Sequence, residues 1–475
     1  MKRIIYLAIA LGTTFPLLNS CRESALEPTL AQDKPVEGNV NTAEALRGIL
    51  NGAYDKMAET NYYGRDIIVL NEVRTDNAFS AGKTGRFREV GQLNTINTTL
   101  EISGFWSKAY EVIVNANVVI NANASGDQAT INHYKGEAYA LRALAHFDLL
   151  RIYGQQNVDG GGMSALGVPY VKNYGEKISP KRNTVQEVYD NAMADLDQAI
   201  SLLSADKDDK TKHYITTNAA KAIKARIALY FKKYDIAKKY AKEVIDSGKY
   251  SVATSKAFAD TFTTDSTANQ IFSIANSGID NRNINSLASI YTETSENSYG
   301  DIEFLKDLYS KYETGDVRRK LFAVSGSAIN KANPERYRCI KYTDTSAIGS
   351  YDIPVIRYEE VVLIYAEALL QTGDSATALT YLNQIASNRG ATKYSSATLD
   401  NILLERRKEF AGEGFRFDDL MRAEKALPIV DAALQKYGRG TSKSEAVPYG
   451  DPKLGIPIPL TELKANPNIK QNKGY

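Results

Sequence analysis

Apolar residues recur at helical spacing along most of the first 250 positions of the chain. The first amphipathic run starts after Asn41-x-x-Glu44, which resembles a capping box, and its apolar face comprises Leu46, Ile49, Leu50, Ala53, Tyr54 and Met57. Three further amphipathic runs follow: about 104–124, about 132–153, which ends at Gly154, and one after Thr184. This pattern predicts a body built mainly from amphipathic α-helices.

Two stretches, 218–246 and 359–386, repeat one pattern of paired short helices. Small and apolar residues recur at hairpin spacing in both, around Tyr234 in the first and Gly373 in the second. Small residues where two helices cross are typical of tetratricopeptide units, which must stack on neighbours to bury their apolar faces. The full tetratricopeptide consensus is absent, so unrelated helical hairpins are the alternative.

The stretch 251–355 lacks helical periodicity, apart from about 301–312. It is rich in Ser, Thr, Asn, Asp, Gly and Tyr and has only short apolar runs, such as 270–274. An irregular segment of this length inside a folded body is either functional or disordered. The sequence therefore predicts an insertion between helical regions at 41–250 and 356–475.

Residues 1–20 have the features of a lipoprotein signal peptide. Two positive residues precede a mostly apolar stretch, too short to span a bilayer, that ends in Leu-Asn-Ser-Cys. This ending resembles a bacterial lipobox, in which Cys21 is acylated and begins the mature chain; an ordinary signal peptide with an incidental Cys is the alternative. Residues 21–40 carry prolines and scattered charges, which predicts a flexible tether between the lipid and the folded body.

Composition narrows the class of protein further. The 475 residues include two Cys, so if Cys21 carries lipid, Cys339 has no partner and stability must come from a large apolar core. No later stretch approaches about 20 consecutive apolar residues. The formal net charge is +2 and no strong basic block is present, which gives no reason to expect nucleic acid.

Motifs for catalysis or metal binding are not apparent. The three histidines, His133, His146 and His213, have no metal-ligand spacing, and His146 lies among apolar residues as a packing residue would. Nucleophile-elbow, zinc-protease and phosphate-loop motifs are missing. We therefore expect no catalytic residues, no metal and no cofactor, although sequence alone does not exclude a glycosidase-type carboxylate pair.

Two stretches, 62–88 and 279–299, mix aromatic residues with planar polar ones. Sugars are held by aromatic ring faces together with bidentate polar groups, and Asn, Asp and Arg are the usual planar partners. The candidate ligand-binding residues in these stretches are Tyr62, Tyr63, Arg74, Asp76, Asn77, Phe79, Phe87, Asn283, Tyr291 and Tyr299.

Two patterns near the C-terminus are not explained by generic helix or turn chemistry. Residues 405–422 read ERRKEFAGEGFRFDDLMR, and 456–475 read IPIPLTELKANPNIKQNKGY. Together with Phe105-Trp106-x-x-x-Tyr110, Leu141-Arg142-Ala143 and Arg357-Tyr358-x-Glu360, in that order, they resemble the SusD/RagB family. These are surface lipoproteins that capture nutrients for outer-membrane transporters of Bacteroidota. Opposite charges alternate at helix spacing within 405–422, which favours ion pairs that lock a helix to its neighbours over a catalytic site.

The resemblance implies a mainly α fold: a tetratricopeptide-like helical-hairpin scaffold, a large irregular ligand-bearing insertion, and an extended C-terminal tail packed on the body. It implies a lipoprotein anchored to the outer membrane and facing the cell exterior. Its ligand would be an oligosaccharide, delivered to a SusC-type TonB-dependent barrel over which the lipoprotein acts as a lid. The only Trp, Trp106, lies in a scaffold motif, which favours small polar glycans or peptides over long α-glucans.

Three other functions are compatible with the sequence. The same fold could capture peptides, as some relatives appear to do. A periplasm-facing helical-repeat lipoprotein could scaffold envelope assembly without any small ligand. A glycan-degrading enzyme is the third. Only Glu23 and Glu27 follow Cys21 closely, whereas some surface-exposed relatives have a clear acidic run there.

Overall fold

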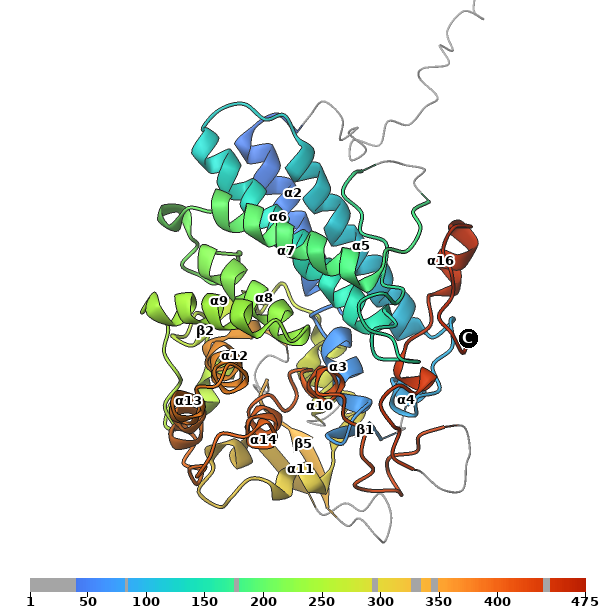
Figure 1. Cartoon of the computed structure of the whole chain (residues 1–475), viewed down its shortest axis with the longest axis vertical. Helices are drawn as coiled ribbons and strands as arrows, with labels where there is room; N and C mark the ends of the chain where they lie inside the picture. Colours follow the sequence, from blue (N-terminus) through green and yellow to red (C-terminus); the bar gives the residue numbers. More distant parts are fainter. Residues whose placement is uncertain are drawn as a thin grey trace, which may run out of the picture.

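The computed structural model describes residues 40–81, 84–174, 179–292, 298–325, 335–342, 349–438 and 445–475. The predicted signal peptide, Cys21 and nearly all of the predicted tether lie outside these residues. The described chain is mainly helical, with a few short strands, as the periodicity predicted (Figure 1). None of its helices is long and apolar enough to cross a membrane.

Four long helices form the N-terminal part of the scaffold: α2 (Ala43–Ala58), α5 (Leu100–Asn121), α6 (Gln128–Tyr153) and α7 (Val185–Leu202). They lie side by side, with α6 contacting the other three (Figure 1). The capping box predicted at Asn41 is wrong, because Thr42 is the N-cap of α2 and its hydroxyl accepts from the Ala45 amide. A capping box does start α7, at Thr184 and Glu187.

Two helical hairpins continue the scaffold: α8 (Thr217–Tyr230) with α9 (Tyr234–Asp246), and α12 (Tyr358–Gln371) with α13 (Ser375–Asn388). The first turn lies at 231–233, just before the predicted position, whereas the second falls at Gly373 as predicted. Helix α9 packs against both α8 and α12, so the two hairpins stack despite the long insertion between them. Their classification as tetratricopeptide units stays a prediction.

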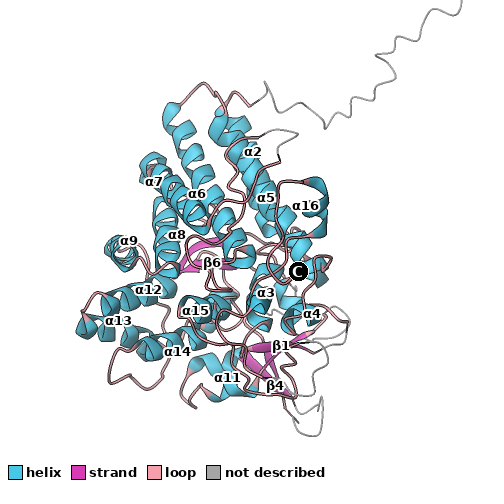
Figure 2. Cartoon of the chain, turned by 45° about the vertical axis from the view of Figure 1, so that its right-hand side comes forward, coloured by secondary structure: helices cyan, strands magenta, loops and turns pink. Residues whose placement is uncertain are grey.

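The insertion forms short strands rather than long helices and supplies most of two small sheets. Strand β2 (Gln270–Ile274) pairs antiparallel with β6 (Ile353–Arg357) beneath α8. The second sheet has the order β1-β3-β5-β4 and lies at the bottom of the molecule in Figure 2. Its strands are β1 (Ala78–Ser80), β3 (Ile302–Phe304), β5 (Arg336–Cys339) and β4 (Phe322–Ser325).

Short helices and turns connect these layers. The helical run expected at 301–312 is only partly helical, because β3 precedes a single turn of helix there. The short α-helices are α3 (Asp66–Val73), α4 (Arg88–Gly91), α10 (Leu287–Tyr291), α11 (Lys306–Ser310), α14 (Leu399–Glu409), α15 (Arg416–Arg422) and α16 (Leu460–Ala465). The 3₁₀ turns are η2 (Ala205–Lys207), η3 (Ala259–Phe262), η4 (Asn283–Asn285), η5 (Val317–Leu321) and η6 (Pro452–Leu454).

The C-terminal tail packs against the body, as predicted. Ile456 and Ile458 are buried in the main apolar core. The Asn472 side-chain amide donates to the Tyr153 carbonyl at 2.9 Å, and its oxygen accepts from Arg182 at 2.6 Å. The tail therefore closes over the end of α6 and the loop that precedes α7 (Figure 1).

Candidate functional site

The charged segment 405–422 and its ion-pair partners, which we call the charged junction, lie in the interior. Glu409 accepts hydrogen bonds from three guanidinium groups, those of Arg318, Arg357 and Arg389, at 2.9–3.2 Å. Burial alone would raise the pKa of Glu409, but the charges of Arg389 and Arg357 outweigh it and hold that pKa below its ordinary value. These ion pairs lock α14 to the insertion and to α13, as the alternating charges of 405–422 predicted.

Three predicted ligand residues belong to this junction. Both carboxylate oxygens of Asp76 accept from Arg416 at 2.8 Å, and the Asn77 side-chain oxygen accepts from Arg407 at 2.8 Å. The Arg74 guanidinium lies over the Phe417 ring, 3.6 Å from its centroid. Their side chains are nearly inaccessible, so in this structure they stabilise the α3–α15 contact rather than face a ligand.

Five further candidates are also buried. The hydroxyls of Tyr62 and Tyr63 both donate to the Asp148 carboxylate at 2.8 Å. The most exposed of the others is Phe79, at 7%, and the remaining two are Phe87 and Tyr291. These side chains are buried, and the rings of Tyr62, Tyr63, Phe87 and Tyr291 contact other side chains inside the protein. In this structure they are therefore not exposed for contact with a ligand.

The two remaining candidates, Asn283 and Tyr299, do reach the surface. The Arg86 guanidinium lies 3.6 Å from the centroid of the Tyr299 ring, so the structure brings the two predicted stretches together. Arg86 also donates to Asp301 at 3.2 Å, and the Tyr299 hydroxyl donates to the exposed Asn285 at 3.3 Å. We call the group Arg86, Asn283, Asn285 and Tyr299 the ligand face.

A pocket with a cavity volume of about 220 Å³ opens beside the ligand face. We call it the α2 pocket, because α2 forms one of its walls. Arg282 ties the opposite wall to α2 by donating to the Ala58 carbonyl at 3.0 Å and to Asp55 at 3.1 Å. Its lining residues are Asn51, Tyr54, Asp55, Ala58, His213, Tyr214, Ile274, Ala275, Asp280 and Arg282. Tyr54 and Tyr214 were not among the candidates predicted from the sequence, because Tyr54 follows the apolar face of its helix.

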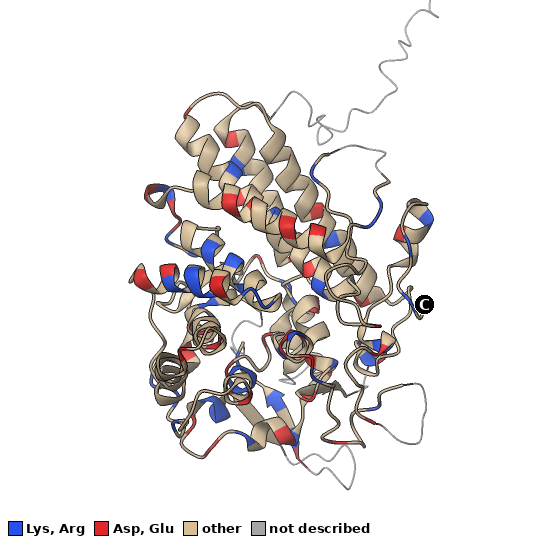
Figure 3. Ribbon diagram, in the orientation of Figure 1, with Lys and Arg blue, Asp and Glu red and all other residues tan. Residues whose placement is uncertain are grey.

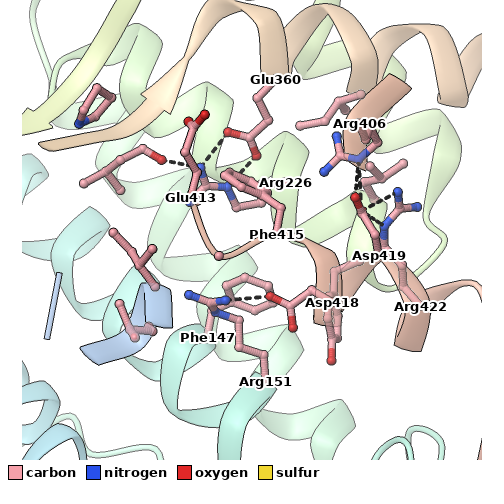
Figure 4. Close-up of a pocket in the computed structure, with 18 of the residues that line it drawn as sticks. Phe147, Arg151, Arg226, Glu360, Arg406, Glu413, Phe415, Asp418, Asp419 and Arg422 are labelled. Atoms are coloured by element: carbon pink, nitrogen blue, oxygen red, sulfur yellow. Dashed lines mark hydrogen bonds and ion pairs between the residues drawn. The ribbon is translucent and has the colours of Figure 1, made fainter. Parts of the chain in front are cut away.

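A second pocket, the central pocket, lies where α6 and α8 meet α12 and α15 (Figure 4). Its cavity volume is about 50 Å³. The charges that line it are paired across the junction: Arg151 donates to Asp418 at 2.6 Å, and Arg226 holds Glu360 through two hydrogen bonds of 2.6 Å. This pocket is small and its cations are already neutralised, so its geometry is that of a contact between helical layers.

The histidines do not assemble with other metal ligands. His146 accepts from the Val171 amide at 2.9 Å and stacks on Tyr170, and burial lowers its pKa to about 3, which confirms it as a packing residue. Among the described residues, no group of three or more His, Cys, Asp and Glu side chains is placed to hold a metal ion. Lys/Arg and Asp/Glu residues intermingle along the described helices rather than gathering by sign (Figure 3).

The fold defines the class: a mainly helical scaffold protein with two small sheets. A model of the SusD family matches residues 111–475, and the chain belongs to that family.

Individual relatives agree with this membership. The SusD-like protein P38 of Formosa agariphila is 25% identical over 97% of this chain and 96% of its own length. The crystal structure of a SusD superfamily protein from Bacteroides vulgatus has a TM-score of 0.82 at 26% identity, covering 92% of this chain and 99% of that one. The starch-binding protein SusD of Bacteroides thetaiotaomicron is 28% identical over 39% of this chain and 33% of its own length.

Proposed function

We propose that this protein is a cell-surface lipoprotein that captures oligosaccharides at the ligand face and passes them to a SusC-type TonB-dependent barrel. The observation that carries the proposal is the pairing of Arg86 with Tyr299 at the surface, next to a pocket. Membership of a family that contains a starch-binding protein supports a carbohydrate ligand.

The chemistry of the ligand face suits a sugar. A tyrosine ring offers an apolar face for the C–H side of a pyranose, and planar amide and guanidinium groups bond adjacent hydroxyls. Tyr299 supplies the ring, held in place by Arg86, while Asn283 and Asn285 supply exposed amides. Buried Asp301 fixes the Arg86 guanidinium from behind, so the face is ordered before a ligand arrives.

Attachment to the membrane is the second part of the proposal. Acylation of Cys21 would hold the folded body at the outer membrane, since each buried methylene contributes about 0.8 kcal/mol and several acyl chains act together. The tether at 21–40 then gives the body freedom to move over a barrel. In this mechanism the protein closes on a bound glycan and opens again, and no covalent bond of the ligand is broken.

Two measurements test the proposal. A mild-detergent pull-down of the tagged protein from its native membrane is expected to recover a large TonB-dependent barrel in near-equal amount. A glycan array with the purified protein is expected to give oligosaccharide binding without any change in oligosaccharide length. Recovery of envelope-assembly proteins without a barrel would overturn the uptake role. Peptide binding without glycan binding, or shortened glycan products, would overturn the ligand assignment.

A further inference from the structure

The α2 pocket has aromatic and polar walls at a scale suited to one sugar residue. The Tyr54 and Tyr214 rings meet edge to face, with centroids 5.0 Å apart, and line the pocket together with buried Ile274. The Tyr54 hydroxyl is already committed, because it donates to Glu137 at 2.7 Å and accepts from the Ile215 amide at 2.9 Å. Tyr54 therefore offers an apolar ring without a free hydroxyl, whereas the Tyr214 hydroxyl has no hydrogen-bond partner among the described residues.

The cations of the α2 pocket are neutralised by partners. Arg282 is bound to the Asp55 carboxylate and to the Ala58 carbonyl. His213 lies 2.6 Å from the carboxylate of buried Asp352, with its Nε2 at that oxygen. The hydrogen bond to Asp352 raises the pKa of His213 despite partial burial, and the further carboxylates of Asp209 and Asp265 act in the same direction.

Among the described residues, the polar side chains that line the α2 pocket without a hydrogen bond or ion pair are those of Asn51, Tyr214 and Asp280. Of these, Asn51 and Asp280 are exposed. The Asp280 backbone is fixed, since its amide donates to the Ser277 hydroxyl at 3.0 Å and its carbonyl accepts from the Ser277 amide at 2.8 Å. The pocket therefore presents a carboxylate on a fixed backbone, without an ion-pair partner among the described residues, and an amide that can donate and accept.

We propose that the α2 pocket binds one uncharged sugar residue of a neutral oligosaccharide, and that Asp280 disfavours acidic sugars there. Free carboxylate and amide oxygens accept hydrogen bonds from sugar hydroxyls, whereas a uronate or sulfate group would face a like charge. The inference rests on the proposed function, because the pocket adjoins the ligand face through η4, whose Asn285 carbonyl accepts from Thr60 just beyond α2.

Matched glycans separate this inference from the proposed function. Calorimetric titration would compare oligogalacturonides with their fully methyl-esterified forms, and xylo-oligosaccharides with and without glucuronic acid branches, at low ionic strength. In each pair that binds, the uncharged member is expected to bind on the order of fivefold more tightly. Equal affinity, or tighter binding of the acidic member, overturns the inference and leaves glycan capture standing. A glycan array on which no oligosaccharide binds overturns both.

Two variants assign the effect to the pocket. Asp280→Asn keeps the shape and removes the charge, so the preference for the uncharged member is expected to shrink to about twofold or less as salt-sensitive repulsion is lost. Asn51→Ala should weaken binding of both members of a pair equally, by about fivefold, because one neutral hydrogen bond is removed. Circular dichroism checks that both variants fold. An unchanged preference in Asp280→Asn contradicts the role of this carboxylate.

Discussion

The charged junction and the ligand face contain the same residue types but differ in their role: the first stabilises the fold, and the second is the proposed binding surface. In the junction, Arg389 is fully buried and holds Glu409 and Glu359 at 2.9 Å. On the ligand face, the Arg86 side chain keeps 31% of its surface exposed and shares its bonds between Thr84 and Asp301. Burial, rather than residue type, therefore decides whether an Arg–carboxylate–aromatic group stabilises the fold or is available to a ligand.

Buried and exposed ion pairs should contribute differently to the free energy of unfolding. A buried ion pair costs much to break, because removing one partner leaves an uncompensated charge in a poorly solvated place. An exposed pair contributes little to stability, since water and salt screen it. Substitutions in the buried regions should therefore lower the free energy of unfolding, and substitutions on the ligand face should lower affinity alone.

Removal of the tail is the largest expected perturbation of the buried side. A chain that ends at Leu454 loses Ile456 and Ile458, each contributing about 1.5–3 kcal/mol by burial, and leaves Arg182 without two of its acceptors. We expect the free energy of unfolding in urea to fall by about 5 kcal/mol or more. A chain that ends at Asn472 is the control and should lose about 1 kcal/mol. Unchanged melting of the shorter chain would contradict the tail's structural role.

Glu409→Gln is the sharpest test of the charged junction. The substitution keeps the side-chain shape but leaves three guanidinium groups around a neutral amide, so we expect a loss of about 3–5 kcal/mol in the free energy of unfolding. Glu424→Gln is the matched control, because the Glu424–Lys232 pair is exposed and should contribute at most about 1 kcal/mol. Equal losses in the two variants would remove the distinction between buried and exposed pairs.

The scaffold helices and the ion pairing of the charged segment could be predicted well, because both have signals that are local in the sequence. Helical periodicity located α5, α6 and α7, and the alternating charges of 405–422 indicated ion pairing. The ion-pair partners of the charged segment could not be located in the same way. Asp76 meets Arg416 across 340 positions, and residues 74–77 have the composition of a sugar site when considered alone.

The residues of the proposed ligand face could be selected from the sequence only in part, for the same reason. Aromatic and planar polar residues occur both in binding sites and in protein interiors, and eight of the ten predicted residues are buried in the structure. The assignment of the two stretches to a ligand site stays a prediction. Arg86 and Tyr299 become a pair only through the fold, which brings the start of α4 against the segment after α10. Tyr54 and His213 enter the α2 pocket from a helix and a loop that carry no ligand signal.

Glu72 provides a pH-dependent test on the buried side. Burial raises its pKa to about 7, although the side chain accepts from Asn77 and from the Gly414 amide. The proton is held more tightly in the folded state than in the unfolded state, where the pKa is about 4.3. The stabilisation it provides is therefore fully present below about pH 4 and is lost as pH rises towards 7.

Glu72→Gln removes that dependence. The free energy of unfolding of the wild type, measured relative to Glu72→Gln, is expected to fall by roughly 2–3 kcal/mol between pH 4.5 and 7.5. The variant also loses the hydrogen bond from Asn77, which shifts its stability by a constant amount, so the slope of the difference with pH is the diagnostic quantity. Parallel stability curves for the two proteins would contradict the assignment.

Tyr299→Ala is the smallest perturbation and tests the exposed side. Loss of the ring should weaken oligosaccharide binding by about tenfold, equivalent to about 1.4 kcal/mol, while the free energy of unfolding changes by less than about 1 kcal/mol. Tyr174→Ala, at an exposed tyrosine outside the ligand face, should change neither quantity. Tyr291→Ala should do the reverse of Tyr299→Ala and destabilise the fold, because its ring is fully buried against Phe304. If Tyr299→Ala kept full affinity, the binding surface would have to lie elsewhere, whereas a loss of stability as large as that of Tyr291→Ala would place Tyr299 on the structural side of the comparison.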